Sequence, residues 1–351
     1  MGGSCNRIGL RSAPQEVESR RTDWASGTAL DRGVILACHS EPPTAFGLAS
    51  RAKLIEALVT KASASPKVDG VIRLGDGRRV AYGEWGDLAG RPVVLLHGTP
   101  GSRLVCPDED ATDAAGVRLI TIDRPGYGLS DARPGRVHLD WVDDFVELAD
   151  QLEIPRCSVV GWSGGAPAAL TLGFRLPDRV ATLGLAAPGG FGDLIPGIAE
   201  AAGWSAEYRA IAELFRRDQT AGIAAFEQRY AWFSGDGWEA MFAGSWGAAD
   251  DRVVADPATL GAMKSMIREA ARQGAAGRVV DEVTELSPRG FSVTHIKQPV
   301  HIWCGALDSI DTRMTADYLA VAIPRATLVT YPDAAHLFAF EYWAEMLAAL
   351  S

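Results

Sequence analysis

Apolar residues gather in short continuous runs along this chain, and stretches with helical periodicity separate the runs. Runs rich in Val, Ile and Leu are typical of strands buried on both faces. Six such runs lie at 91–98, 116–126, 156–162, 179–189, 298–305 and 326–333. The helical stretches lie at roughly 108–115, 139–153, 165–175, 311–322 and 338–350. This alternation predicts an α/β fold with a mostly parallel, doubly wound sheet that helices cover on both sides.

The N-terminal part of the chain has a different pattern. Residues 71–86 (VIRLGDGRRVAYGEWG) form two alternating runs around Asp76-Gly77, a strong short-range signal for a β-hairpin. Residues 1–67 have weak periodicity, with Ser, Arg, Ala and Pro spread throughout. We expect these residues to be a mostly disordered leader.

Between about 190 and 295 the strand–helix alternation stops. No strand-like run occurs there, but aromatic and Met residues are frequent: Trp204, Tyr208, Phe215, Phe226, Tyr230, Trp232, Phe233, Trp238, Met241, Phe242, Trp246, Met263 and Met266. We predict a helical cap over 191–295, inserted into a core that consists of 68–190 and 296–351. Most of these side chains are expected to pack against the main domain, and the remainder to line a pocket.

Charge narrows the range of partners. The 351 residues carry a formal net charge of −10, with a pI near 5.2, and the basic residues are scattered. This distribution offers no electrostatic footprint for a phosphate backbone or an anionic surface. We therefore expect a small-molecule substrate and neither nucleic acid nor membrane as a partner, while the oligomeric state is left open.

Cysteine usage indicates the compartment. The five cysteines are odd in number and include no C-x-x-C pair, which favours reduced thiols over a disulfide framework. The sequence has no signal-peptide pattern and no run of about 18 apolar residues that could span a membrane. These features predict a cytoplasmic protein.

A candidate nucleophile follows one of the predicted strands. In GWSGGAP (161–167), Ser163 lies between the run that ends at Trp162 and the helical stretch that follows. So tight a strand–turn–helix forces its apex residue into a strained conformation, and Gly161 and Gly165 allow the two elements to approach. The helix N-terminus then presents free N–H groups at the Ser163 hydroxyl.

A serine nucleophile needs a base, and the base needs a carboxylate to orient it. Of the six histidines, His336 lies in a loop between the last strand and the last helix, at the edge where catalytic loops gather. The segment WCGALDSID offers Asp308 and Asp311. Asp308 is favoured as the partner because it lies at the mouth of its strand, whereas Asp311 is expected to cap the following helix.

An acyl-transfer site also needs donors for an oxyanion. The backbone N–H of Gly164, which follows the nucleophile, is one predicted donor. The loop HGTPGS (97–102) after an early strand supplies the other. Thr99 presents an N–H there, and Pro100 has none.

Five segments in this order, HGTPGS, DRPGYGLSD, GWSGG, GALD and DAAH, resemble the α/β-hydrolase superfamily over about 68–351. The resemblance implies a sheet of the α/β-hydrolase type with a helical cap, and a triad of Ser163, Asp308 and His336. Haloalkane dehalogenases and epoxide hydrolases of this superfamily carry Asp in place of Ser163 and are disfavoured. Proline iminopeptidases usually have HGGPG, where this chain has Thr99 in place of a glycine.

The predicted activity is hydrolysis of a carboxylic ester, thioester or lactone of a small, apolar substrate through an acyl-enzyme. The chain contains no zinc-protease, P-loop or dinucleotide motif, so neither a metal nor a cofactor is expected. One alternative is an aminopeptidase or C–C bond hydrolase with the same triad, in which Glu200, Glu207 or Glu213 could hold a substrate amine. A further alternative is a non-catalytic, ligand-binding member of the fold.

Overall fold

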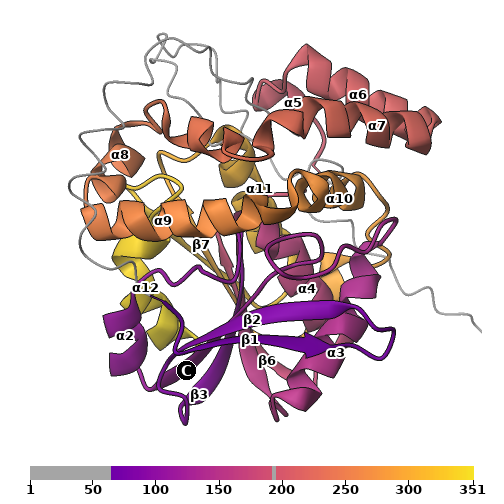
Figure 1. Cartoon of the computed structure of the whole chain (residues 1–351). Coiled ribbons are helices and arrows are strands. Elements are labelled where there is room, and N and C mark those ends of the chain that lie inside the picture. Colours follow the sequence, from indigo (N-terminus) through magenta and orange to yellow (C-terminus); the bar gives the residue numbers. More distant parts are fainter. Residues whose placement is uncertain (1–64, 192–194) are drawn as a thin grey trace, which may run out of the picture. The chain divides into compact units, whose positions relative to one another are not determined.

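Eight strands form one sheet in the computed structural model, which describes residues 65–191 and 195–351 (Figure 1). The strands are β1 (Val68–Arg73), β2 (Arg79–Gly86), β3 (Arg91–Leu96), β4 (Val117–Ile122), β5 (Cys157–Trp162), β6 (Val180–Ala186), β7 (Val300–Gly305) and β8 (Ala326–Tyr331). Their order across the sheet is β1-β2-β4-β3-β5-β6-β7-β8. Only β2 pairs antiparallel, with β1 and with β4, and the other pairs are parallel. The predicted mostly parallel, doubly wound sheet is confirmed.

The first two strands form the predicted hairpin. Arg73 pairs with Arg79, and Gly77 in the turn adopts a φ of +89°, which a side chain would strain. The expected leader over 1–67 lies outside the described residues except for its last three. Of these, Lys67 donates its backbone N–H to the Glu84 carbonyl oxygen at 2.7 Å.

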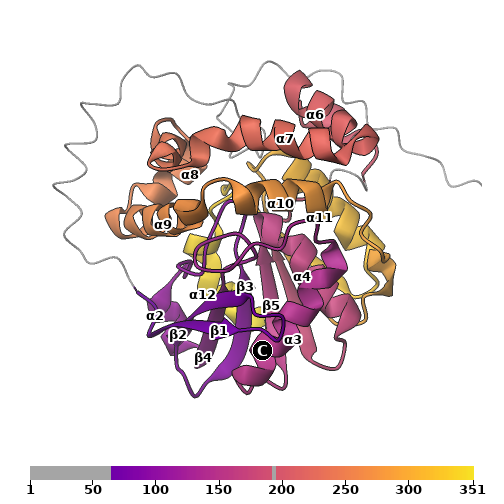
Figure 2. The same ribbon diagram turned by 45° about the vertical axis from the view of Figure 1, so that its right-hand side comes forward.

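Helices cover both faces of the sheet, as the continuous apolar runs require. On one face lie α2 (Glu109–Ala114) and α12 (Ala339–Ala349); on the other lie α3 (Trp141–Gln151), α4 (Ala166–Arg175) and α11 (Ile310–Ala322) (Figures 1 and 2). Strand β3 shows why its run is continuous. Val94 and Leu96 join the apolar cluster under α3 and α4, whereas Val93 and Leu95 join the cluster that contains α12.

Between β6 and β7, residues 195–295 contain helices and turns but no strand, and we call them the helical segment. Its helices are α5 (Ile198–Ala201), α6 (Ala206–Arg217), α7 (Gln219–Tyr230), α8 (Ala248–Val254), α9 (Pro257–Ala270) and α10 (Ala276–Glu285). Helices α8, α9 and α10 lie above the carboxyl ends of the parallel strands (Figures 1 and 2).

The aromatic and Met residues of this segment divide into two groups. Phe233, Trp238, Trp246, Met263 and Met266 are buried in the apolar cluster that continues into the core, as expected. The second group packs within the segment, between α6, α7 and α10: Tyr208, Phe215, Phe226 and Tyr230. The helical segment thus has a small apolar core of its own besides the contact with the sheet.

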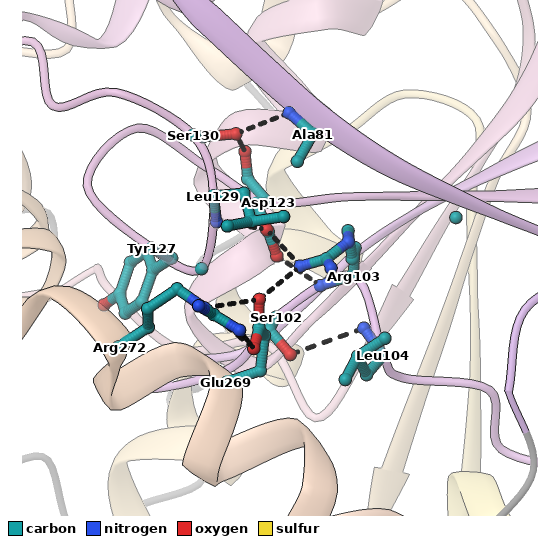
Figure 3. Close-up of polar contacts among 12 residues, drawn as sticks. Ala81, Ser102, Arg103, Leu104, Asp123, Tyr127, Leu129, Ser130, Glu269 and Arg272 are labelled. Carbon is teal, nitrogen blue, oxygen red and sulfur yellow. Dashed lines mark hydrogen bonds and ion pairs between the residues drawn. The ribbon is translucent and has the colours of Figure 1, made fainter. Parts of the chain in front are cut away.

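A buried ionic cluster attaches α9 to the core, and we call it the Arg103 junction (Figure 3). The Arg103 guanidinium donates to Asp123 at 2.8 Å, to Glu269 of α9 at 2.7 Å, and to both oxygens of Asp69 at 2.6 and 3.1 Å. Asp123 also accepts the backbone N–H groups of Arg103 and Leu129. Every guanidinium nitrogen of Arg103 therefore has a partner.

Candidate active site

Ser163 lies at the apex of a sharp turn between β5 and α4. Its φ of +52° is in the left-handed region that a serine rarely adopts. Close packing explains the flanking glycines: a Cβ on Gly165 would lie 2.2 Å from the Leu96 carbonyl oxygen, and one on Gly161 would lie 2.6 Å from the Ala166 Cα. Sequence reasoning anticipated this turn because strand, Gly-x-Ser-x-Gly and helix follow one another directly.

The loop after β3 lies against this turn. A Cβ on Gly98 would lie 3.1 Å from the Ser163 Cβ, and a Cβ on Gly164 would lie 3.3 Å from the Thr99 backbone nitrogen. The two backbone N–H groups expected to bind an oxyanion, those of Thr99 and Gly164, therefore belong to segments in direct contact beside Ser163.

Asp308 and His336 form a hydrogen-bonded pair. Nδ1 of His336 lies 3.0 and 3.1 Å from the two carboxylate oxygens of Asp308, which is 7% exposed. Their loops follow β7 and β8, and the Leu307 N–H donates to the Ala334 carbonyl oxygen at 3.0 Å. Because parallel strands end at one edge, the pair lies at the same edge as Ser163. Trp162 donates its indole N–H to the His336 carbonyl oxygen at 3.4 Å.

The predicted role of Asp311 is wrong. Helix α11 begins at Ile310, so Ser309 occupies the N-cap position and Asp311 lies in the first turn. The sequence WCGALDSID contains three residues of types that cap helices, Asp308, Ser309 and Asp311, and only the position of the first helical residue distinguishes them.

The electrostatic environment favours a charged His336. Burial opposes protonation of the ring, but the carboxylates of Asp308, Asp250 and Asp311 outweigh it and raise the pKa of His336 to about 9. This value lies above the range of 6–7 in which a catalytic histidine commonly titrates. The difference arises because three acidic residues act on one ring: Asp308 from the loop after β7, Asp311 from the first turn of α11 and Asp250 from α8.

Sequence reasoning missed Asp250 of α8. Its carboxylate is 3% exposed and accepts the backbone N–H groups of His336 at 3.2 Å and Leu337 at 2.9 Å. Burial raises the pKa of Asp250, although these backbone hydrogen bonds oppose the shift. The helical segment thus holds the loop that carries His336.

Sequence reasoning also missed a second buried cluster, which we call the Thr99 junction: Thr99, Arg124, Tyr127, Arg136 and Asp281 of α10. Asp281 accepts hydrogen bonds from the Thr99 hydroxyl at 2.9 Å and from Arg124 and the Tyr127 hydroxyl at 2.8 Å each. It also accepts one from Arg136 at 2.5 Å. Arg124 in turn donates to the Gly98 carbonyl oxygen and the Thr99 hydroxyl at 3.0 and 2.9 Å. This cluster fixes the Gly98–Thr99 loop from the side of the helical segment.

One signal for these residues was present in the sequence. In α10, two acidic residues, Asp281 and Glu282, occupy positions between the apolar residues Val279 and Val283. All four side chains are buried. An acidic residue at such a position needs a buried cation, but the sequence does not say which.

Within residues 65–191 and 195–351, no group of three or more His, Cys, Asp or Glu side chains could hold a metal ion. No helix of this part of the chain is both long and apolar enough to cross a bilayer. Cys106, Cys157 and Cys304 are buried free thiols.

Comparison with known proteins gives partial sequence matches. A stretch of 122 residues is 35% identical to the dihydrolipoyllysine-residue acetyltransferase component of the acetoin cleaving system of Pseudomonas putida, which is 34% of this chain and 33% of that protein. Another of 145 residues is 34% identical to 2-hydroxymuconate semialdehyde hydrolase of Pseudomonas sp. CF600, which is 37% of this chain and 50% of that protein. The chain thus matches a third to a half of the length of these relatives.

The fold has counterparts among solved structures. The esterase RhEst1 from Rhodococcus sp. ECU1013 superposes with a TM-score of 0.54 at 19% identity, over 81% of this chain and 99% of that one. The family model described as alpha/beta hydrolase fold matches residues 91–341, which include Ser163, Asp308 and His336. The chain therefore belongs to the alpha/beta hydrolase fold family.

Proposed function

We propose that this protein is a serine hydrolase that cleaves a carboxylic ester, thioester or lactone through an acyl-enzyme, with Ser163 as nucleophile. The observation that carries the proposal is the left-handed turn at Ser163, with the hydrogen-bonded Asp308–His336 pair at the same edge of the sheet. A binding protein needs neither a strained serine nor an oriented histidine.

In the first half of the reaction, the neutral His336 accepts the Ser163 proton as Oγ attacks the substrate carbonyl. Asp308 fixes the ring through Nδ1, so that Nε2 is the basic nitrogen, and stabilises the imidazolium. The N–H groups of Thr99 and Gly164 hold the tetrahedral oxyanion. The imidazolium then protonates the departing alcohol, and the acyl group remains on Ser163.

In the second half, His336 takes a proton from water, which attacks the acyl-enzyme. The second tetrahedral intermediate uses the same two N–H donors. Its collapse returns the proton to Ser163 and releases the acid. The helical segment would act as a cap that excludes bulk water during these steps.

The amine-binding role considered for three glutamates has no structural support. Glu200, Glu207 and Glu213 are all exposed, and the last two pair with Arg229 and Arg217. An ester panel tested beside aminoacyl amides and β-diketones would separate an esterase from an aminopeptidase and from a C–C bond hydrolase. We retain the cytoplasm as the proposed location because the described cysteines are free.

The proposal is tested by intact-mass analysis after exposure to a fluorophosphonate. We expect one adduct on the wild type and on Ser292→Ala, an exposed control serine, but none on Ser163→Ala. On the best ester of the panel, Ser163→Ala should lower kcat by about 10⁴–10⁶-fold. A fall of less than tenfold, or an equal adduct on Ser163→Ala, would show that Ser163 is not the nucleophile. No adduct on any variant would favour a binding protein.

A further inference from the structure

A small cavity borders Gly164, between the core and α10. Its volume is about 20 Å³, room for a water molecule or for one end of a carboxylate. The lining residues that matter here are Arg124, Arg136, Trp141, Gly164, Asp281 and Glu285. Since Gly164 follows the proposed nucleophile directly, a substrate bound at Ser163 lies next to this cavity.

Within residues 65–191 and 195–351, three residues that line the cavity carry a buried N–H donor without a hydrogen-bond partner: Nε of Arg124, Nε of Arg136 and the indole Nε1 of Trp141. The Nε2 of His138, another lining residue, also lacks a partner there. The residues Arg124, Arg136 and Trp141 are between 2% and 6% exposed. A buried donor without an acceptor is costly, and three around one cavity point to an acceptor that completes the site. The guanidinium of Arg103 shows that this fold can satisfy every nitrogen of a buried arginine where no ligand is needed.

The charge around the cavity favours an anion. Two guanidinium groups, those of Arg124 and Arg136, share the single carboxylate of Asp281. Burial and the neighbouring carboxylates of Glu282 and Asp281 raise the pKa of Glu285 well above its usual range, so this residue adds no negative charge at neutral pH. The ten-residue helix α4 also begins at the cavity, and its N-terminus adds a positive potential.

We propose that this cavity receives a carboxylate of the substrate, whose oxygens accept the free N–H groups of Arg124, Arg136 and Trp141. The inference rests on the proposed function and narrows it: the substrate is an ester that also carries a free carboxylate, such as a monoester of a short dicarboxylic acid. The predicted apolar substrate thus acquires a charged end. A buried water molecule is the competing occupant, since it could accept from the same donors without selecting for charge.

Binding is tested first, because it does not depend on turnover. Succinate, glutarate and adipate are titrated by calorimetry into the wild type, Trp141→Phe, Arg136→Lys and the control Trp343→Phe. The indole of Trp343 donates to the Thr112 hydroxyl at 2.9 Å, so it already has a partner. At least one dicarboxylate should bind the wild type and Trp343→Phe equally, and about tenfold more weakly to Trp141→Phe and Arg136→Lys.

The tryptophan pair also has a stability signature. Trp141→Phe removes a donor that lacks a partner, so the ligand-free melting temperature should stay the same or rise, whereas Trp343→Phe breaks a buried hydrogen bond and should lower it. No binding of any dicarboxylate to the wild type, or binding that Trp141→Phe and Arg136→Lys leave unchanged, would show that the cavity holds only water.

Turnover then separates the inference from the proposed function. Mono-p-nitrophenyl esters of the three diacids are compared with p-nitrophenyl esters of neutral acids of matched length. The wild type should prefer a charged ester by about tenfold or more in kcat/KM, and Trp141→Phe should reduce that preference. Hydrolysis of neutral and charged esters at equal rates overturns the inference alone. Binding of dicarboxylates without hydrolysis of any ester overturns the proposed function alone.

Discussion

The Arg103 junction and the Thr99 junction both consist of buried arginine–carboxylate pairs, but we assign them different roles. Both join a core arginine to a carboxylate of the helical segment: Arg103 to Glu269 of α9, and Arg124 to Asp281 of α10. In the Arg103 junction every guanidinium nitrogen has a partner, and Figure 3 labels two of the partner residues, Asp123 and Glu269. In the Thr99 junction the Nε atoms of both arginines have none within the part of the chain that the structure describes, and both arginines line a cavity.

This difference teaches how to interpret a buried ion pair. A cluster whose donors are all satisfied attaches one element to another, and its loss should cost stability. A cluster with free donors beside a reactive turn is incomplete without a ligand, and its loss should cost rate or selectivity. The predictions below test whether the two junctions separate in this way, from the largest expected effect to the smallest.

The largest effect on stability is expected from Arg103→Met. The substitution leaves Asp123 buried without its cation and leaves Glu269 with Arg272 alone, which should lower the free energy of unfolding by about 3–5 kcal/mol. Urea unfolding measures the loss, and kcat per folded molecule should remain near that of the wild type. Arg103→Lys, which keeps the charge, should lose less. An unchanged free energy of unfolding together with a hundredfold lower kcat would place Arg103 in the active site. The Arg103 junction and the Thr99 junction would then no longer differ in role.

At the other junction, Arg124→Met should mainly lower the rate. Without Arg124 the Gly98 carbonyl and the Thr99 hydroxyl lose a donor, so the Thr99 N–H is no longer held for the oxyanion. We expect kcat to fall by about 10²–10³-fold, as for the loss of one oxyanion donor. The loss of stability should be smaller than for Arg103→Met, because Asp281 keeps Arg136. Arg179→Met removes a partly exposed ion pair with Asp150 and serves as the control with unchanged kcat.

The pH dependence of the rate tests a third contact of the helical segment, at the His336 loop. Only the neutral ring can accept the Ser163 proton, and a pKa of about 9 leaves it mostly protonated at pH 7. The value of kcat/KM should therefore rise about fiftyfold between pH 7 and pH 9 and level off above. A profile that is already flat from pH 7 upward would mean that the three carboxylates act on His336 far less than their positions imply.

The smallest effect is expected from Asp250→Asn, measured beside Asp311→Asn. Both variants remove one negative charge near His336, and both should move the rise in kcat/KM to lower pH, Asp250→Asn by about half to one pH unit. Only Asp250 also accepts the His336 and Leu337 N–H groups, so only its variant should lower the high-pH plateau of kcat, by about threefold to tenfold. Equal plateaus in the two variants would reduce Asp250 to an electrostatic role.

The sequence predicted most of the core because each of its signals is local. A strand buried on both faces needs a continuous apolar run, so β3 and β5 could be located from Val, Leu and Ile alone. The turn at Ser163 could likewise be predicted from seven consecutive residues, 161–167. His336 and Asp308 could be named because parallel strands deliver the loops that follow them to one edge, whatever the details of packing.

The roles of Asp250, Asp281, Arg124 and Arg136 could not be predicted in the same way. Each depends on a partner more than 80 residues away, and the acidic residues lie on helices whose placement over the sheet no local pattern encodes. The prediction that Asp311 caps α11 was wrong for a smaller reason: the N-cap, Ser309, lies two residues earlier.

The amino-acid sequence by itself therefore determined the sheet and the helical nature of the segment between β6 and β7, and it supplied the residues that we propose for acyl transfer. Those depend on periodicity, turn chemistry and strand polarity, which act over a few residues. Only the tertiary structure decided which carboxylates hold the reactive loops, and that donors beside Gly164 remain without a partner. A buried charge loses its hydration and is stabilised only by the particular groups around it. Folding brings those groups together from distant parts of the chain.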